Sequence, residues 1–185
     1  MTERPRLLVL GLGNALLGDD GVGPAAVALL RERYAVPNGV RILDGGTLGL
    51  SLLPYLEEAD AVMLIDAIAG DGPPGTLICL EGDEVGPAVA MRLSPHQVGV
   101  ADLLDGARWL DLYPRRVVLL GLVPHSIELA VGLSPDVSRA LPRLVARVIR
   151  EIGEFGYSLA PRQDDQSLEG IDLGLLVAAA GGTDA

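Results

Sequence analysis

Residues 6–23 read RLLVLGLGNALLGDDGVG and combine a continuous apolar run with a glycine-rich loop. The run, residues 6–12, is typical of a strand that is buried on both faces of a parallel sheet. Pro24 follows the loop and suits the first turn of a helix, which we expect to end near Tyr34. A buried strand, a glycine loop and a helix in this order indicate an α/β fold.

The same alternation continues along the chain. Apolar runs predict four further strands, at residues 39–44, 60–66, 76–82 and 116–123. A helix is expected from Thr47 to about Glu58, although Pro54 disfavours helix in its first half. A second begins at Ser94-Pro95-His96-Gln97 and runs to about Leu112. A third begins at Ser134-Pro135 and ends at Gly153 or Gly156. We therefore predict a three-layer α/β/α fold with a twisted, mostly parallel sheet of about five strands.

The chain length suits one domain. The 185 residues suffice for one hydrophobic core, and we expect a single α/β domain over residues 1–157. Residues 158–185 have weak periodicity and many Gly and Asp residues, so we expect a flexible C-terminal tail there.

Charge and cysteine content limit the partners and the compartment. The formal net charge is -11 and all 14 basic residues are Arg, so we expect binding to neither nucleic acid nor anionic membrane. Cys79 is the single cysteine, which indicates a reducing compartment. We expect the side chains of Cys79 and Trp109 to pack in the interior. No apolar run is long enough for a membrane helix or a signal peptide. We expect a monomeric, cytoplasmic protein.

Polar groups follow the predicted strands at one edge of the sheet, where ligands bind in open α/β folds. Asp19 and Asp20 lie in the loop after the first strand, Asp44 ends the second strand and Asp66 the third, and His96 starts a helix. Carboxylates gathered at one edge repel each other unless a cation or a proton joins them. Two carboxylates and one imidazole, from Asp20, Asp66 and His96, would make an open site for zinc or nickel.

Each of these residues also has a structural interpretation. Asp19 and Asp20 could stabilise the following helix, because acidic groups favour helix N-termini. Asp66 could bond the Gly-Asp-Gly turn at residues 70–72, and His96 could only hold its helix start. The sequence pattern alone leaves both interpretations open.

Other motifs predict no chemistry. His125 and Glu128 have HxxE spacing, but Pro124 and Gly132 leave little room for a helix that could carry a metal site. The dinucleotide fingerprint GxGxxG would need glycine at position 16, where Leu16 stands. The GxSxG motif of α/β-hydrolases and the HExxH motif of zinc proteases are absent.

Five sequence blocks, in order, resemble the hydrogenase maturation endopeptidases. They are GLGNALLGDDGVG at 11–23, DGGT at 44–47, LIDAI at 64–68, SPHQVG at 94–99 and GLVPHSIELAVGLSPDVSRALP at 121–142. The resemblance covers about residues 7–155 and implies a phosphorylase/hydrolase-like sheet between helices. It also implies that Asp20, Asp66 and His96 are the metal-binding and catalytic residues.

The resemblance implies one specific proteolytic cut. Family members remove the C-terminal extension of the [NiFe]-hydrogenase large-subunit precursor after nickel insertion, with the nickel as the recognition signal. The protein would then need no tightly held metal of its own, although another divalent metal could occupy the site in isolation. The ion would polarise the scissile carbonyl or lower the pKa of an attacking water, and Asp19 or a metal-bound hydroxide would serve as the base.

The DGGT segment, Asp44, Gly45, Gly46 and Thr47, is expected to contact substrate, because its glycines permit close backbone approach. A plain turn with a helix cap is the competing interpretation. For the whole protein, the main alternative is a non-catalytic nickel-binding checkpoint protein that docks on the precursor. An unrelated metallopeptidase or amidase, and a purely structural α/β module, are further alternatives.

Overall fold

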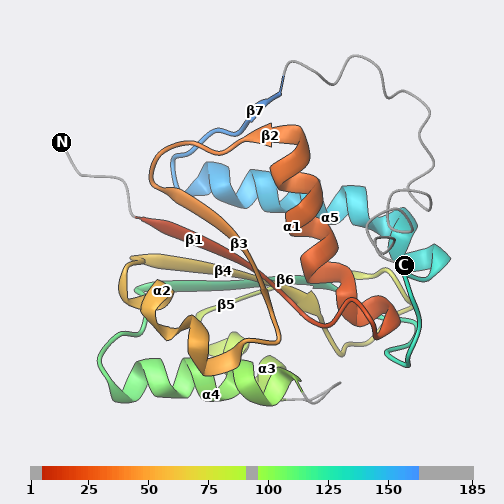
Figure 1. Cartoon of the computed structure of the whole chain (residues 1–185), viewed down its shortest axis with the longest axis horizontal. Helices are drawn as coiled ribbons and strands as arrows, with labels where there is room; N and C mark the ends of the chain where they lie inside the picture. Colours follow the sequence, from red (N-terminus) through yellow and green to blue (C-terminus); the bar gives the residue numbers. More distant parts are fainter. Residues whose placement is uncertain (1–5, 91–95, 163–185) are drawn as a thin grey trace, which may run out of the picture.

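The computed structural model describes residues 6–90 and 96–162, without the side chains of residues 90 and 96–98. Within these residues a five-stranded sheet has the order β3-β1-β4-β6-β5 (Figure 1). Its strands are β1 (Leu7–Leu12), β3 (Val40–Gly46), β4 (Ala61–Ala67), β5 (Leu77–Glu81) and β6 (Arg116–Leu122). Strands β3, β1, β4 and β6 are parallel, and β5 runs antiparallel to β6 at one edge. The prediction of a mostly parallel sheet is confirmed.

Helices cover both faces of this sheet, as Figure 1 shows. One face packs against α1 (Val22–Arg33) and α5 (Pro135–Glu154), and the other against α2 (Leu53–Glu57), α3 (Val85–Ala90) and α4 (His96–Trp109). Every residue of β1 and β4 is buried, as the continuous apolar runs predicted for strands between two helical layers. Two separate apolar cores result, and the three-layer prediction is confirmed.

Glycines let α1 lie directly against the ends of the strands. A Cβ atom at Gly23 would fall 2.2 Å from the carbonyl oxygen of Leu12 and 2.4 Å from that of Ile65. The helix therefore begins in contact with the carboxyl ends of both β1 and β4. This contact fixes the loop that joins β1 to α1 over the same edge of the sheet.

Some predicted boundaries differ from the structure. The helix expected from Thr47 to Glu58 is divided into the 3-10 helix η2 (Gly49–Leu52) and the short α2, and Pro54 lies at the start of α2. The sequence did not predict β2 (Tyr34–Ala35) and β7 (Ala160–Pro161), which form an antiparallel pair. The N–H of Arg162 then donates to the carbonyl of Arg33 at 2.8 Å, so the chain stays attached to the domain at least to Arg162. The rest of the predicted tail, 163–185, lies outside the described residues.

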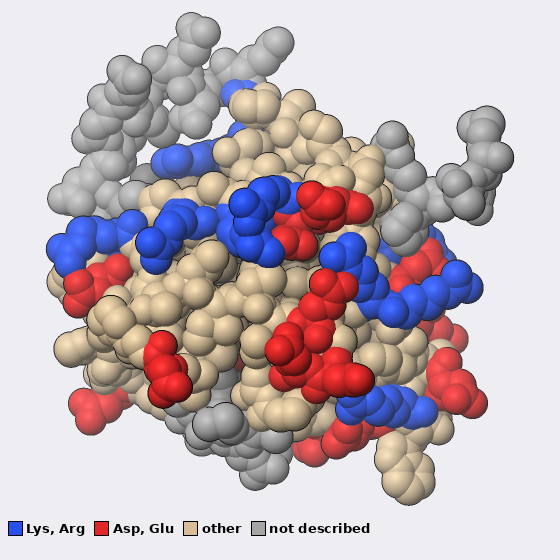
Figure 2. Space-filling view, turned by 180° about the vertical axis from the view of Figure 1, so that it is seen from behind, with Lys and Arg blue, Asp and Glu red and all other residues tan. Residues whose placement is uncertain are grey.

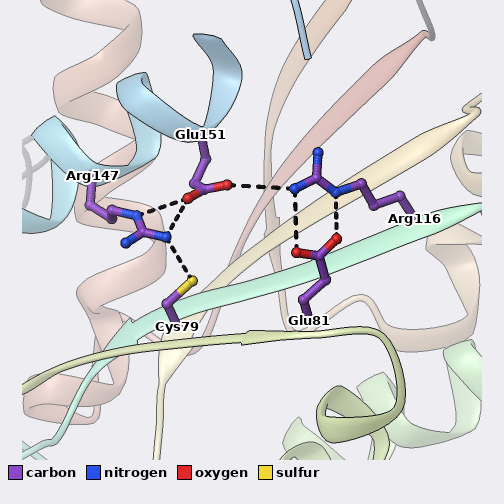
Figure 3. Close-up of polar contacts among 5 residues, drawn as sticks. All are labelled: Cys79, Glu81, Arg116, Arg147 and Glu151. Atoms are coloured by element: carbon purple, nitrogen blue, oxygen red, sulfur yellow. Dashed lines mark hydrogen bonds and ion pairs between the residues drawn. The ribbon is translucent and has the colours of Figure 1, made fainter. Parts of the chain in front are cut away.

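The edge strand β5 is joined to α5 by charged side chains (Figure 3). The Arg116 guanidinium pairs with Glu81 on β5 and lies 3.9 Å from the buried Glu151 on α5. Arg147 bonds Glu151 as well, and its Nη2 donates to the Sγ of Cys79 at 3.1 Å. The prediction that Cys79 lies in the core is wrong, because this edge strand leaves its side chain exposed.

Trp109 also differs from its prediction. It lies at the end of α4 and is 88% exposed, so it does not pack in the interior. The reason is that α4 already buries its apolar face through Val100, Leu103, Leu104 and Ala107.

Charges are mixed on the surface seen in Figure 2, where arginine side chains lie among Asp and Glu side chains. Among the described residues, no helix combines the length and the apolar character needed to span a bilayer.

Candidate active site

Asp20 lies in the loop between β1 and α1, in the 3-10 helix η1 (Gly18–Gly21), and is fully buried. Its Oδ2 accepts the backbone N–H of Asn14 at 2.8 Å, which closes the loop on itself. Gly13 has a φ of +122°, and a Cβ atom there would fall 1.8 Å from the carbonyl oxygen of Asp20. Glycine at position 13 is therefore what allows Asp20 to lie so close to the end of β1.

Asp66 is the next-to-last residue of β4 and is 2% exposed. Its Oδ1 accepts the N–H of Ala67 at 2.8 Å. Gly121 lies opposite Asp66 on β6, and a Cβ atom at Gly121 would fall 2.0 Å from the carbonyl oxygen of Asp66. Asp66 thus lies at the carboxyl end of a central strand, the edge of the sheet where ligands bind in open α/β folds.

The 44–47 segment is bonded to the loop that carries Asp20. The carbonyl of Gly46 accepts the N–H of Gly13 at 3.0 Å, directly beyond β1. Asp44 is exposed and lies within β3, which continues to Gly46, so the prediction that it ends its strand is wrong. Its Oδ1 accepts the N–H of Gly46 at 3.0 Å, so Asp44 stabilises the turn, and Thr47 beside it is exposed.

Helix α4 begins at His96, and its first turn lies against the same segment. A Cβ atom at Gly99 would fall 3.0 Å from the Cα of Gly49, so the two backbones are in contact there. The contacts Gly13–Gly46 and Gly49–Gly99 thus connect the loop after β1, the 44–49 segment and the start of α4.

The side chain of His96, and Ser94 and Pro95 before it, lie outside what the structure describes, so their predicted roles stay predictions. Among the described side chains, no three His, Cys, Asp or Glu groups gather as a metal site. The imidazole of His96 is not among these described side chains. The ligand set Asp20, Asp66 and His96 therefore also stays a prediction.

Asp19 has a role that the sequence did not reveal. It is fully buried, and its Oδ2 accepts the N–H groups of His125 at 2.7 Å and Ser126 at 3.3 Å. Its Oδ1 accepts the N–H of Ser134 at 2.6 Å, at the start of α5. Both oxygens accept backbone N–H groups, which gives Asp19 a structural role in joining these loops. Its predicted role as a base stays a prediction.

Helix capping of α1 by these carboxylates is not observed. The residue before α1 is Gly21, with no side-chain cap, whereas Asp19 and Asp20 bond other segments. His125 is exposed and lies with Glu128 in an irregular loop, so the two residues do not share a helix face. No sequence pattern could show that Asp19 bonds a segment more than 100 residues away, because such a contact depends on strand order.

Known proteins are similar to this chain in sequence. The family model described as hydrogenase maturation protease matches residues 24–151. The hydrogenase 2 maturation protease of Escherichia coli K12 is 38% identical over 159 residues, which cover 85% of this chain and 97% of the relative. The hydrogenase expression/formation protein HupD of Rhodobacter capsulatus is 41% identical over 157 residues, 83% of this chain and 74% of the relative.

Solved structures agree with the sequence relatives. The hydrogenase maturating endopeptidase HybD from Escherichia coli superposes with a TM-score of 0.81 at 37% identity, covering 86% of this chain and 99% of that chain. The [NiFe] hydrogenase maturation protease HybD from Thermococcus kodakarensis has a TM-score of 0.66 at 29% identity, over 79% and 98% of the two chains. The resemblance in the five sequence blocks is thereby confirmed, and this chain belongs to the hydrogenase maturation protease family.

Proposed function

We propose that this protein is the endopeptidase that removes the C-terminal extension of a [NiFe]-hydrogenase large-subunit precursor after nickel insertion. The observation that carries the proposal is the pair of buried carboxylates, Asp20 and Asp66, at the carboxyl edge of β1 and β4. The contact of Gly49 with Gly99 sets the first turn of α4 against the 44–49 segment and supports the inclusion of His96 in this site. Family membership supports proteolysis as the activity.

The chemistry of the three donors suits an ion that the substrate brings. Two carboxylates and one imidazole offer an incomplete ligand set, which would bind a divalent metal only weakly in the isolated protein. They would complete the coordination of nickel that the precursor already holds through its thiolates. The nickel would polarise the scissile carbonyl or lower the pKa of the attacking water. Specificity for the nickel-loaded precursor follows, because the site is complete only with that substrate.

The 44–47 segment is proposed to contact the C-terminal extension. Gly46 has a φ of +43°, and Thr47 and the following Leu48 are exposed beside the loop that holds Asp20. An extended peptide that reaches the site could therefore bond this backbone. A single cysteine in the chain fits maturation in a reducing compartment, and we propose the cytoplasm.

The proposal is tested by incubating the protein with nickel-loaded and nickel-free precursor and weighing the products by mass spectrometry. We expect loss of the C-terminal peptide from the nickel-loaded form only. Binding of the loaded precursor without cleavage would favour the non-catalytic checkpoint protein, which would use the same fold and site. Equal cleavage of both forms would show that nickel is not the recognition signal.

A further inference from the structure

Two loops at the carboxyl edge of the sheet expose three large apolar side chains. Leu16 lies in the loop after β1 and is 60% exposed, while Leu129 and Val131 lie in the loop after β6 and are 83% and 78% exposed. Single exposed Leu or Val residues are common on protein surfaces, but several on adjoining loops indicate a contact surface. These three residues are called the apolar rim below.

Backbone bonds hold the two loops together. The N–H of Ala130 donates to the carbonyl of Leu16 at 3.1 Å, and the N–H of Gly18 donates to the carbonyl of Ala130 at 2.9 Å. Ala130 stands between Leu129 and Val131, so these bonds fix the apolar rim across both loops. The buried Asp19 carboxylate reinforces the joint by accepting N–H groups at both ends of the second loop. A surface fixed in advance loses little conformational entropy when a partner binds.

The apolar rim adjoins the proposed site of cleavage. Leu16 and Asp20 belong to one short loop, and Asp19 beside Asp20 holds the loop that carries Leu129. A folded substrate that presents its peptide bond to this loop would therefore lie over the apolar rim. We propose that the apolar rim binds an apolar patch on the folded body of the large-subunit precursor, separately from the nickel and the C-terminal extension. This inference rests on the proposed function.

A second exposed apolar pair serves as a comparison. Trp109 and Leu110, at the end of α4, are 88% and 58% exposed. A helix of 14 residues such as α4 is about 20 Å long, so this pair lies far from the helix start that adjoins the site. Variants of this pair therefore control for the loss of exposed apolar surface in general.

The test uses the full chain and the nickel-loaded precursor. The rim variant carries Leu129→Ser and Val131→Ser, and the control variant carries Trp109→Ser and Leu110→Ser. We expect the rim variant to raise the KM for the precursor by about 10-fold or more with kcat nearly unchanged, because it removes binding that is equal in ground and transition states. The control variant should stay within about twofold of the unchanged protein in both constants.

Circular dichroism melting checks folding, and we expect little change because the altered side chains are exposed. If the rim variant melts early, Leu16→Ser tests the same surface from the other loop, again through a raised KM. A KM equal to that of the unchanged protein would overturn the inference while the proposed function stands. Failure of the unchanged protein to process the precursor would instead overturn the proposed function. Sedimentation of the protein alone gives a further test, since a dimer that the rim variant dissociates would assign the surface to self-association and overturn the inference.

Discussion

The carboxylate of Asp19 accepts the backbone N–H of Ser134 at 2.6 Å and so ties the loop after the first strand to the start of the last helix. The same carboxylate accepts the N–H groups of His125 and Ser126. One buried side chain thus joins two loops that meet at the proposed active site. Its neighbour Asp20 faces a different partner, the N–H of Asn14.

We predict that Asp19→Asn lowers the free energy of unfolding by about 3 kcal/mol. An NH2 group replaces one carboxylate oxygen and cannot accept a hydrogen bond from a backbone N–H. The remaining hydrogen bonds are weaker because their acceptor is no longer charged. Urea unfolding followed by circular dichroism measures the loss. Asp102→Asn, at an exposed position on α4, is the control and should change stability by less than about 0.5 kcal/mol. Equal stability of the two variants would contradict a structural role for Asp19.

Gly13→Ala is expected to stop processing, because its methyl group would meet the carbonyl oxygen of Asp20 and displace that residue. Gly82→Ala is the matched control: Gly82 also has a positive φ, +61°, but nothing lies within 4 Å of its added Cβ. We expect Gly13→Ala to cost about 2 kcal/mol of stability beyond the control, and only the control to process the precursor. Normal processing by Gly13→Ala would mean that Asp20 is not positioned by this glycine.

Most of the fold follows from local sequence signals, and part of the site does not. The buried strands and the helix start at Pro135 follow from apolar runs and Ser-Pro pairs, which depend only on neighbouring residues. The exposure of Cys79 could not be predicted, because it depends on the edge position and antiparallel direction of β5. The pairing of β2 with β7 depends in the same way on chain segments brought together only by folding.

The site shows the same division. The predicted ends of the first and third strands put Asp20 and Asp66 at one edge of the sheet, because the carboxyl ends of parallel strands lie together. The structure has both residues at that edge. The bonds of Asp19 were not predictable, because they connect the loops after β1 and β6, which the strand order separates by β4.

The Arg116 guanidinium bonds Glu81 at 2.5 Å and holds the pKa of that carboxyl below its ordinary value. The unfolded chain therefore takes up the proton first, so this stabilisation is present above about pH 4.3 and is lost as the pH falls through the lower folded pKa. Because Glu81 is half exposed, the effect is about 1 kcal/mol or less.

Arg116→Gln is predicted to reduce this acid sensitivity. Urea unfolding gives the free energy of unfolding at pH 7 and at pH 3, and the difference between the two values measures the acid sensitivity. The loss of the Arg116 contact with the Phe155 ring affects both values equally and cancels in the difference. The variant should show the smaller difference. Identical differences in the two proteins would rule out the Glu81–Arg116 pair as a source of pH dependence.

Cys79 is predicted to react with a disulfide reagent such as dithionitrobenzoate in the folded protein, because its side chain is exposed. The neighbouring chain still covers part of the sulfur, and this desolvation raises the pKa of the Cys79 thiol more strongly than Arg147 lowers it. The reaction should therefore be slower at neutral pH than that of free cysteine. The rate should rise most at pH values above about 8.5, the ordinary pKa of a cysteine thiol. Reaction only after denaturation would contradict the exposed position.

The central claim is that Asp20, Asp66 and His96 act together on the precursor's nickel. The most direct measurement compares His96→Ala with the unchanged protein, by mass spectrometry of the nickel-loaded precursor and by melting of each protein alone. We predict that His96→Ala melts within a few degrees of the unchanged protein, because removing one side chain at a helix start costs about 1 kcal/mol or less, yet leaves the C-terminal extension uncut. A folded His96→Ala protein that removes the extension at the normal rate would contradict the account.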